Sequence, residues 1–325
     1  MIQYINPSTN EPLTEAYNGL LNMDQRVIFP LINGVYIIDG TDNYAANFGF
    51  EWQLFSRTQL DKHIGLNVSK QRFFLETRWQ NIPPDENMLE VGCGAGRFSQ
   101  IVLQHTQANL YTVDLSDAVQ VNFQNNGPHN RLKLFRASVY ALPFKNETFD
   151  KVFCFGVLQH TIDVKKSVQC LVDMVKPGGE IVLDFYPLIG WYSKINAKYL
   201  LRPFLKKINH EKLLKLIRKN IDWMIKLHQF NSKIGLGVLN RFIPVCDITN
   251  TVPSDLNKHD FREWVVLDTF DMFSPAYDQP QRLETVSQWL TEFGMTDVDA
   301  QMITYYKKNT AATVKAKKPL SKSIS

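Results

Sequence analysis

The sequence has no long hydrophobic run and few cysteines. No uncharged apolar stretch approaches the roughly 20 residues that a membrane-spanning helix needs. The first residues, MIQYINPSTNEPL, lack a basic segment followed by an apolar one, so we expect no signal peptide and a cytoplasmic location. The four cysteines form no CxxC pair, which argues against a zinc site and favours buried free thiols.

Basic residues are concentrated in one part of the chain. Between Tyr186 and Lys233 there are eleven Lys or Arg and two acidic residues, a net charge of +9, which leaves −5 for the rest of a chain whose total is +4. Because the basicity is local, it argues against a general DNA- or RNA-binding protein and for a local role of this segment.

Strand and helix patterns alternate between residues 87 and 186. Helical patterns lie near 96–105, 116–125 and 164–175, and a Pro177-Gly178-Gly179 turn predicts a break before the last strand. Short apolar strands alternating with helices predict an α/β fold whose mostly parallel sheet is covered on both faces. The strand candidates are 88–91, 110–114, 132–137, 151–156 and 180–186.

Five segments follow from these patterns. Near the N-terminus, Asn33-Gly34 separates two strand pieces. Near the C-terminus, a helix at 283–294 precedes a last strand or strand pair at 296–308. The last segment is rich in Lys, Ala and Ser, which predicts disorder. The segments are a β-like N-terminal module (1–45), the α/β core (46–186), a basic helical insertion after the fifth strand (187–275), the remainder of the core (276–308) and a disordered tail (309–325).

A glycine-rich turn joins the first strand of the core to its first helix. Glycines at such a junction let the backbone turn tightly and approach a ligand. The spacing is GxGxG after an acidic residue, and Arg97 stands where a dinucleotide-binding fingerprint would have its third glycine. This disfavours a nicotinamide oxidoreductase and suits a cationic ligand. The motif consists of Glu90, Gly92, Gly94 and Gly96.

The second strand ends in Asp114, 24 residues after Glu90. A carboxylate at this strand end can accept hydrogen bonds from both ribose hydroxyls of a nucleoside. Leu115 follows it, where it would pack on an adenine. Alternatively, Asp114 caps the turn that follows it.

These residues carry a family resemblance. LEVGCGAGRF, VDLS, LPFKNETFDKVFCFGVLQHT and VKPGGEIVLDFY follow one another as they do in class I S-adenosylmethionine (SAM)-dependent methyltransferases, and the chain is similar to the bacterial branch of ubiquinone and menaquinone biosynthesis methyltransferases. The resemblance covers residues 90–186 and, loosely, 283–308. It implies a Rossmann-like, doubly wound sheet of about seven strands with a helical lid after the fifth, and SAM as cofactor, leaving S-adenosylhomocysteine as product.

The resemblance also implies roles for single residues. The glycine turn and Glu90 would line the methionine part of SAM, and Asp114 would hold the ribose. The turn after the third strand would lie at the adenine. In this turn, Ser138 stands where the family usually has an acidic residue. The implied contacts beyond the first two strands are Ser138, Val139 and Phe155. We predict no metal.

Two groups are candidates for acceptor chemistry. His160, in FGVLQHT after the fourth strand, is the best candidate for a general base; the alternative is that Gln159 and His160 only form a loop against SAM. In VLDTFDMFSPAYDQP, Tyr277 could orient an acceptor hydroxyl; turn and cap chemistry around the prolines is the alternative. The second group is Asp268, Asp271, Tyr277 and Asp278.

The insertion contains a helical pattern over 209–229 with an apolar face and a basic face. A lid helix with a solvated basic face is the favoured interpretation; an anionic acceptor and weak contact with an anionic membrane surface are the alternatives. The N-terminal module weakly resembles a zinc-ribbon, but Asn6 and Thr9 stand where the first pair of cysteines would be, so we expect a metal-free packing or homodimer element.

The sequence therefore predicts a methyltransferase acting on oxygen or nitrogen of a small molecule, such as an envelope sugar, a quinone-like compound or a secondary metabolite. DNA is excluded as a partner and RNA is disfavoured. The alternatives are a SAM-binding partner protein without catalysis and a tRNA or protein methyltransferase that docks through the basic insertion.

Overall fold

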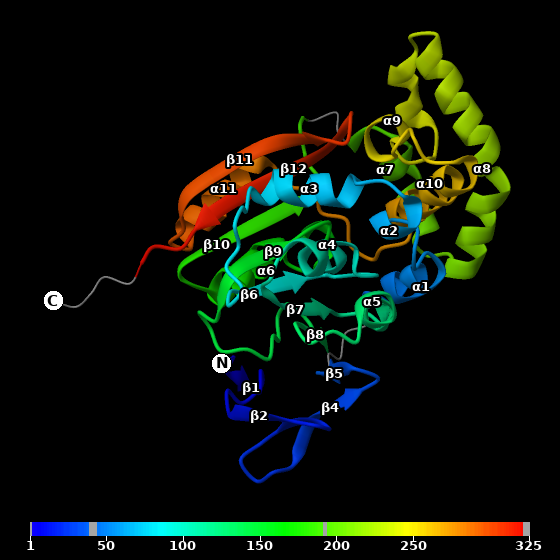
Figure 1. The fold of residues 1–325 in the computed structure, drawn as a ribbon. Helices are drawn as coiled ribbons and strands as arrows, with labels where there is room; N and C mark the ends of the chain where they lie inside the picture. The colour runs from blue at the N-terminus through cyan, green and yellow to red at the C-terminus, as the bar shows by residue number, and fades with distance from the viewer. Residues whose placement is uncertain (1, 39–43, 191–193, 321–325) are drawn as a thin grey trace.

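The computed structural model describes residues 2–38, 44–190 and 194–320, in which helices pack around a twisted sheet (Figure 1). Twelve strands form this sheet. They are β1 (Tyr4–Ile5), β2 (Pro12–Ala16), β3 (Gly19–Leu21), β4 (Val27–Ile32), β5 (Val35–Ile37), β6 (Asn87–Val91), β7 (Asn109–Asp114), β8 (Leu132–Arg136), β9 (Phe149–Cys154), β10 (Val175–Phe185), β11 (Thr296–Tyr305) and β12 (Asn309–Lys317).

The strand order is β1-β2-β3-β4-β5-β8-β7-β6-β9-β10-β12-β11. The pairs from β5 to β10 in this order are parallel, whereas β12 runs antiparallel to both β10 and β11. We predicted about seven, mostly parallel strands; the sheet is instead mixed and has twelve, because the N-terminal strands extend its edge by the pairing of β5 with β8. The strand order reverses beside β6. In open α/β sheets, ligands bind at such a reversal, at the carboxyl ends of the strands.

Helices cover both faces of the sheet. Successive residues of one strand point to opposite faces, so Leu89 of β6 joins one hydrophobic cluster and Met88 joins another. Helices α3, α4 and α5 contact one another in sequence, and α6 packs with α11 (Figure 1). The helices are α1 (Ala46–Leu54), α2 (Asp61–Ile64), α3 (Val68–Thr77), α4 (Arg97–His105), α5 (Ala118–Asn126), α6 (Val164–Met174), α7 (Ala197–Leu205), α8 (His210–Lys233), α9 (Ile248–Thr251), α10 (Lys258–Phe273) and α11 (Leu283–Glu292), with 3₁₀ turns η1 (Leu158–His160) and η3 (Gly237–Phe242).

The N-terminal strands pack on the sheet through aromatic rings. β4 and β5 are joined by Asn33 and Gly34, both with positive φ (49° and 79°), as the sequence predicted for a tight hairpin. The Tyr36 ring stacks on Phe135 at 5.0 Å, and the Tyr4 ring lies 6.0 Å from Phe135. The module therefore contributes to the core.

The insertion after β10 contains α7 to α10. Helix α8 begins after Asn209, whose Oδ1 accepts hydrogen bonds from the backbone N–H groups of Glu211 and Lys212. It ends at Lys233, four residues beyond the predicted helix. Its predicted apolar face packs on α10. The buried residues of this face include Leu213, Leu214, Ile217, Ile221 and Met224.

Two local predictions were wrong. The tail was expected to be disordered from Asn309, but Asn309–Lys317 forms β12, in which Ala312, Val314 and Ala316 alternate into the core. The segment 321–325 of that prediction lies outside the described residues. The break expected at Pro177-Gly178-Gly179 is a register shift inside β10, between Val175 and Glu180.

Some classes of structure are absent from the described ranges. Within them, no helix is both long and apolar enough to cross a membrane. Nor do three or more His, Cys, Asp or Glu side chains gather there in a way that could hold a metal ion. The four cysteines are free thiols, and Cys93, Cys154 and Cys246 are buried.

Candidate active site

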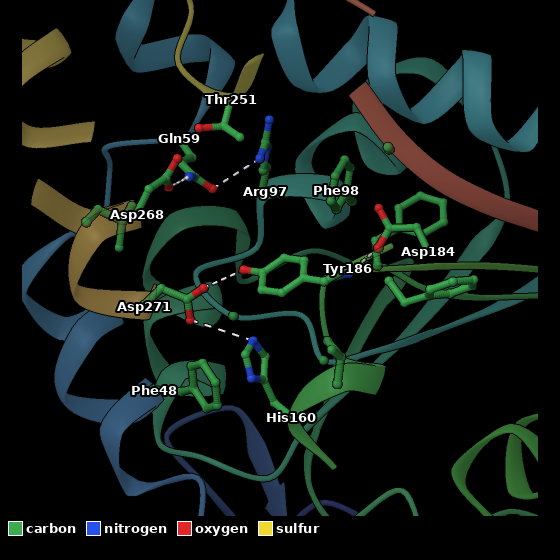
Figure 2. Close-up of a pocket in the computed structure, with 18 of the residues that line it drawn as sticks. Phe48, Gln59, Arg97, Phe98, His160, Asp184, Tyr186, Thr251, Asp268 and Asp271 are labelled. Atoms are coloured by element: carbon green, nitrogen blue, oxygen red, sulfur yellow. Dashed lines mark hydrogen bonds and ion pairs between the residues drawn. The ribbon is translucent and has the colours of Figure 1, made fainter. Parts of the chain in front are cut away.

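A cavity of about 640 Å³ opens at the carboxyl ends of β6, β7, β9 and β10 (Figure 2). Its volume lies in the usual range for small-molecule sites. The loops that follow these four strands contribute to its wall, and helices α1 and α10 close it from the other side. Among the residues predicted for the site, those that line the cavity are Gly92, Gly94, Asp114, Leu115, Val139, Phe155 and His160.

The glycine turn reaches the cavity at Gly94. Its φ is +51°, and a Cβ atom at this position would lie 3.0 Å from Nε1 of Trp52. Gly96 has a different role, because a Cβ there would meet the side chains of Asn122 and Asn126 on α5 rather than the cavity. The last glycine of the motif therefore permits close packing of α4 on α5, and it does not line the site.

Asp114 links the first two loops of the site. Its Oδ2 accepts a hydrogen bond from Gly94 N–H at 2.9 Å, and its Oδ1 accepts from Ser116 N–H at 2.9 Å and from Ser116 Oγ at 2.7 Å. Burial raises the pKa of this carboxyl, against these hydrogen bonds. Since Asp114 and Leu115 both line the cavity, the carboxylate holds the glycine turn in place and also faces the site.

Glu90 does not line the cavity, although the sequence placed it there. It lies on β6 with its carboxyl buried beneath α4, where Ser99 Oγ donates a hydrogen bond to Glu90 Oε2. Because burial favours the neutral form, the pKa of Glu90 rises to about 8. The residue supports the glycine turn from behind.

We therefore predict a distinct pH dependence of stability for the variant Glu90→Gln. The folded protein holds a proton on Glu90 up to about pH 8, whereas the unfolded chain loses it near pH 4.5, so the wild type loses stability as the pH rises through this interval. This single group can change the free energy of unfolding by at most about 1.4 kcal/mol per pH unit. Glu90→Gln should be close to the wild type near pH 5 and more stable at pH 8 to 9, measured by urea unfolding; a constant difference across this range would refute the assignment.

Ser138 was predicted to contact the adenine, but the structure places it outside the cavity wall. Its Oγ accepts a hydrogen bond from Tyr140 N–H at 3.2 Å and so stabilises the turn. Ser138 is not part of the cavity wall, whereas its neighbours Ala137 and Val139 are. The adenine would therefore contact apolar side chains here.

His160 lies buried in η1, at the wall of the cavity. Its Nδ1 is 3.0 Å from the carbonyl oxygen of Tyr277, and since a carbonyl can only accept, Nδ1 carries the proton. Nε2 then has a lone pair, and no described residue hydrogen-bonds to it. Burial lowers the pKa of His160, which keeps the imidazole neutral near pH 7.

Asp271 lies between His160 and the half-buried Tyr186 (Figure 2). Tyr186 donates its hydroxyl to Asp271 Oδ2 at 2.5 Å, and Asp271 Oδ1 is 3.8 Å from His160 Nε2. Tyr277 does not line the cavity: its ring packs against Tyr44, and only its backbone carbonyl serves the site. Of the three tyrosines that line the cavity, Tyr44, Tyr186 and Tyr305, the one bonded to Asp271 is Tyr186, which directly follows β10 and which the sequence did not single out.

The α10 carboxylates predicted as an acceptor wall do line the cavity. Asp268 and Asp271 lie three residues apart on the same face of α10 rather than in a loop. Asp268 accepts hydrogen bonds from Gln59 Nε2 and Trp264 Nε1, both at 3.1 Å. Burial and the neighbouring carboxylate raise its pKa to about 7.

Helix α1 contributes a wall that the sequence did not predict. Phe48, Glu51 and Trp52 line the cavity, and the Phe48 ring lies 5.1 Å from that of His160. Glu51 is buried, and its Oε2 has no hydrogen bond from the described residues. Burial, together with Asp271 and Asp268, raises the pKa of Glu51 well above its usual value.

Arg97, the residue that disfavoured a dinucleotide fingerprint, also lines the cavity. Its Nε donates to Ser69 Oγ at 2.8 Å and its Nη1 to Gln59 Oε1 at 3.1 Å. The guanidinium lies over the rings of Phe98 and Trp264. Contacts with Gln59, which precedes α2, with Ser69 of α3 and with Trp264 of α10 thus hold it in the wall.

Acidic residues outnumber basic ones around the cavity. The lining residues include six carboxylates and three cations, and α8 contributes none of its lysines. The raised pKa values of Glu51 and Asp268 reduce this excess of negative charge, but the wall favours a cationic sulfonium over a pyrophosphate. The residues present therefore suit SAM. The charged residues are Glu51, Asp114, Asp184, Asp247, Asp268 and Asp271, against Arg72, Arg97 and Lys198.

Comparison with known proteins agrees with SAM as the cofactor. Residues 89–183 match the family model described as a methyltransferase domain. The chain is 30% identical to a tRNA U34 carboxymethyltransferase of Campylobacter curvus over 143 residues, 40% of this chain and 46% of that protein. It is 28% identical to a ubiquinone/menaquinone biosynthesis C-methyltransferase of Francisella tularensis subsp. novicida over 153 residues, 42% and 61% of the two chains.

A third relative, phosphoethanolamine N-methyltransferase 2 of Caenorhabditis elegans, is 25% identical over 112 residues, 34% of this chain and 26% of that protein. Each match spans less than two thirds of the relative, and the names of the three relatives imply three different acceptors. What their names share is transfer of a methyl or carboxymethyl group, and the family match at 89–183 contains the glycine turn. Residues 89–183 therefore form a methyltransferase domain of the class I kind, whose cofactor is SAM.

Proposed function

We propose that this chain transfers a methyl group from SAM to an oxygen or nitrogen atom of a small-molecule acceptor. One observation carries the proposal: the glycine turn and the chain Tyr186–Asp271–His160 open into the same cavity of about 640 Å³. A space of this size, closed by α1 and α10, suits a cofactor together with a small acceptor.

The cofactor would occupy the carboxyl ends of β6, β7 and β9. Gly92 and Gly94 would contact its methionine part, with Phe155 beside it, and Asp114 would accept from the ribose. Leu115, Ala137 and Val139 would form the apolar contact with the adenine. Glu90 and Gly96 act behind this surface, by shaping the turn.

Within this arrangement His160 is the proton acceptor. SAM supplies a methyl carbon that its sulfonium activates, so the protein has to align the acceptor and remove its proton. The free lone pair on Nε2 takes the proton of an acceptor hydroxyl or ammonium group. Asp271, 3.8 Å away, stabilises the imidazolium that results, and Tyr186 holds Asp271 in position.

Modification of tRNA is the second candidate function. It is favoured by the similarity to a tRNA U34 carboxymethyltransferase and by the exposed lysines of α8. Against it stands the cavity wall, in which acidic residues predominate. A phosphate backbone would have to approach this wall, whereas a small neutral or cationic acceptor would not be repelled.

A labelling experiment tests the proposal. The purified protein is incubated with SAM labelled in its methyl group and, separately, with small-molecule, tRNA and protein fractions of a cell extract. We expect label only in the small-molecule fraction, with release of S-adenosylhomocysteine. Label in tRNA alone would establish the second candidate. Binding of SAM without label in any fraction would indicate a SAM-binding protein without catalysis.

A further inference from the structure

Helix α8 has a second apolar face that points away from the core. Five large apolar side chains follow one another at intervals of seven, four, three and four residues, which places them on one side of the helix. Each is between 39% and 57% exposed. We call this set the outer stripe: Leu216, Trp223, Leu227, Phe230 and Ile234.

The apolar surface continues past the end of α8. Val238, Leu239 and Phe242 of η3 are exposed, Val238 to 71%. Asn240 of the same turn donates through Nδ2 to the carbonyl oxygen of His228, which fixes η3 on α8 at 3.1 Å. In Figure 1, α8 and the yellow segment after it form the outer margin of the molecule, far from the N-terminal strands. Exposed apolar clusters of this kind mark interaction surfaces.

A row of lysines borders the outer stripe. Four lysines recur every seventh residue, so they stack along one side of α8, and all are exposed. Within the described part of the chain, none of their ammonium groups forms an ion pair or hydrogen bond. We call this set the lysine row: Lys212, Lys219, Lys226 and Lys233.

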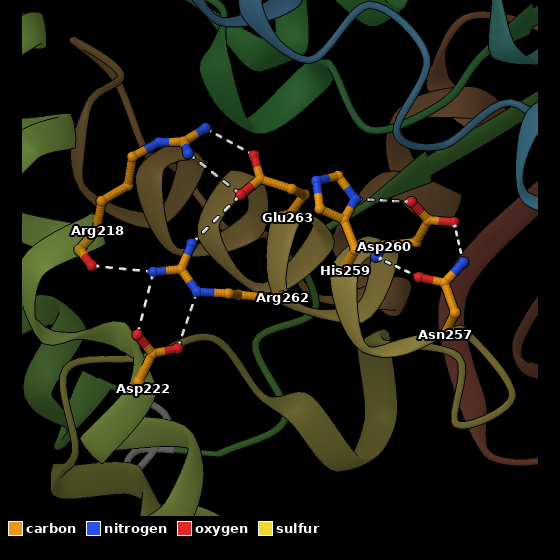
Figure 3. A network of polar contacts seen from close by, with 7 residues as sticks. All are labelled: Arg218, Asp222, Asn257, His259, Asp260, Arg262 and Glu263. Atoms are coloured by element: carbon orange, nitrogen blue, oxygen red, sulfur yellow. Dashed lines mark hydrogen bonds and ion pairs between the residues drawn. The ribbon is translucent and has the colours of Figure 1, made fainter.

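The charges that do form ion pairs connect α8 with α10. Figure 3 shows Arg262 of α10 between Asp222 and Glu263, with Arg218 bonded to Glu263. Asp222 is one of only two acidic residues in α8, and this network engages it; the other is Glu211, in the first turn. Lys226 is attracted to the nearby Asp222, but no ammonium group of the lysine row forms an ion pair with a described residue of its own helix.

We propose that α8 and η3 bind the surface of an anionic lipid bilayer. Aromatic and aliphatic side chains enter the boundary between headgroups and acyl chains, and adjacent lysines reach the headgroups. A second copy of the chain fits less well, because two lysine rows would repel each other. RNA would satisfy the lysines but would leave the outer stripe exposed to water. A bilayer with anionic headgroups complements both features.

Vesicle binding tests this proposal with the intact protein. We expect sedimentation with phosphatidylcholine vesicles that contain phosphatidylglycerol, little sedimentation with phosphatidylcholine alone, and release by high salt. Two double variants separate the contributions: Trp223→Ser with Phe230→Ser, and Lys219→Glu with Lys226→Glu. Each should weaken binding at least about tenfold. The matched control, Lys145→Glu with Lys317→Glu, changes the net charge equally but lies outside the insertion.

All variants should still be stabilised by S-adenosylhomocysteine, because none of the altered residues lines the cavity. The tryptophan emission of the wild type should shift to the blue on adding anionic vesicles, and this shift should be lost in Trp223→Phe. Equal loss of binding in the control pair would overturn the proposal. So would self-association or tRNA binding that depends on α8 while vesicles are not bound.

Discussion

Gly94→Arg should abolish binding of S-adenosylhomocysteine. Gly94 has a φ of +51°, and a Cβ atom there would already lie 3.0 Å from Trp52 Nε1, so a long side chain must extend into the cavity. We expect the affinity to fall by about two orders of magnitude or more, and the thermal stabilisation by the ligand to vanish with it.

The control for this variant is Gly294→Arg. Gly294 also has a positive φ, +81°, but nothing lies within 4 Å of a Cβ there, and it is not part of the cavity wall. Placing a side chain at a positive φ should lower the folding stability of both variants by a similar amount, about 1 kcal/mol. In Gly294→Arg, however, ligand binding should remain. If Gly94→Arg still binds S-adenosylhomocysteine as the wild type does, the glycine turn is not the cofactor site.

His160→Gln should lower turnover by about 10²- to 10⁴-fold, the usual contribution of a general base, and should leave SAM binding nearly unchanged. The expectation rests on an imidazole whose Nδ1–H is held by the carbonyl of Tyr277 and whose Nε2 is free. Turnover is measured as methyl transfer to the acceptor fraction found by labelling. A suitable control is His228→Gln, which changes a buried histidine of α8 that does not line the cavity.

The pH profile gives an independent test of the same residue. Because the neutral imidazole is the active form, turnover of the wild type should fall as the pH drops through the pKa of His160. Burial lowers this pKa, so the midpoint of the acid limb should lie below 6.5. The limb should be absent in His160→Gln. An unchanged rate and an unchanged profile in this variant would remove His160 from the role of base.

The sequence predicted the part of the fold that depends on local signals. Apolar runs of four to six residues predicted β6 to β9 to within two residues at each end, and the glycines marked the turn after β6. Asp114 could be placed at the site because residues that follow parallel strands meet at one edge of the sheet. Asp268 and Asp271 were singled out by composition, although they lie on α10 rather than in a loop.

The residues that were missed reach the site through distant contacts. Glu51 lies beside Asp268 and Asp271, more than 200 residues away in the chain, and nothing in the local pattern of α1 indicates this. Ser138 lies outside the cavity wall because its hydroxyl bonds the local backbone, and Tyr277 does so because its ring packs on Tyr44. The alternating residues of β12 were visible, but the lysines between them resembled a solvated tail.

The most direct test of the account is calorimetric titration of the intact protein with S-adenosylhomocysteine, SAM and NAD. The glycine turn, the carboxylate of Asp114 and the acidic cavity wall together predict saturable binding of both sulfur nucleosides and no binding of NAD. Binding of NAD with no heat from either sulfur nucleoside would contradict the account.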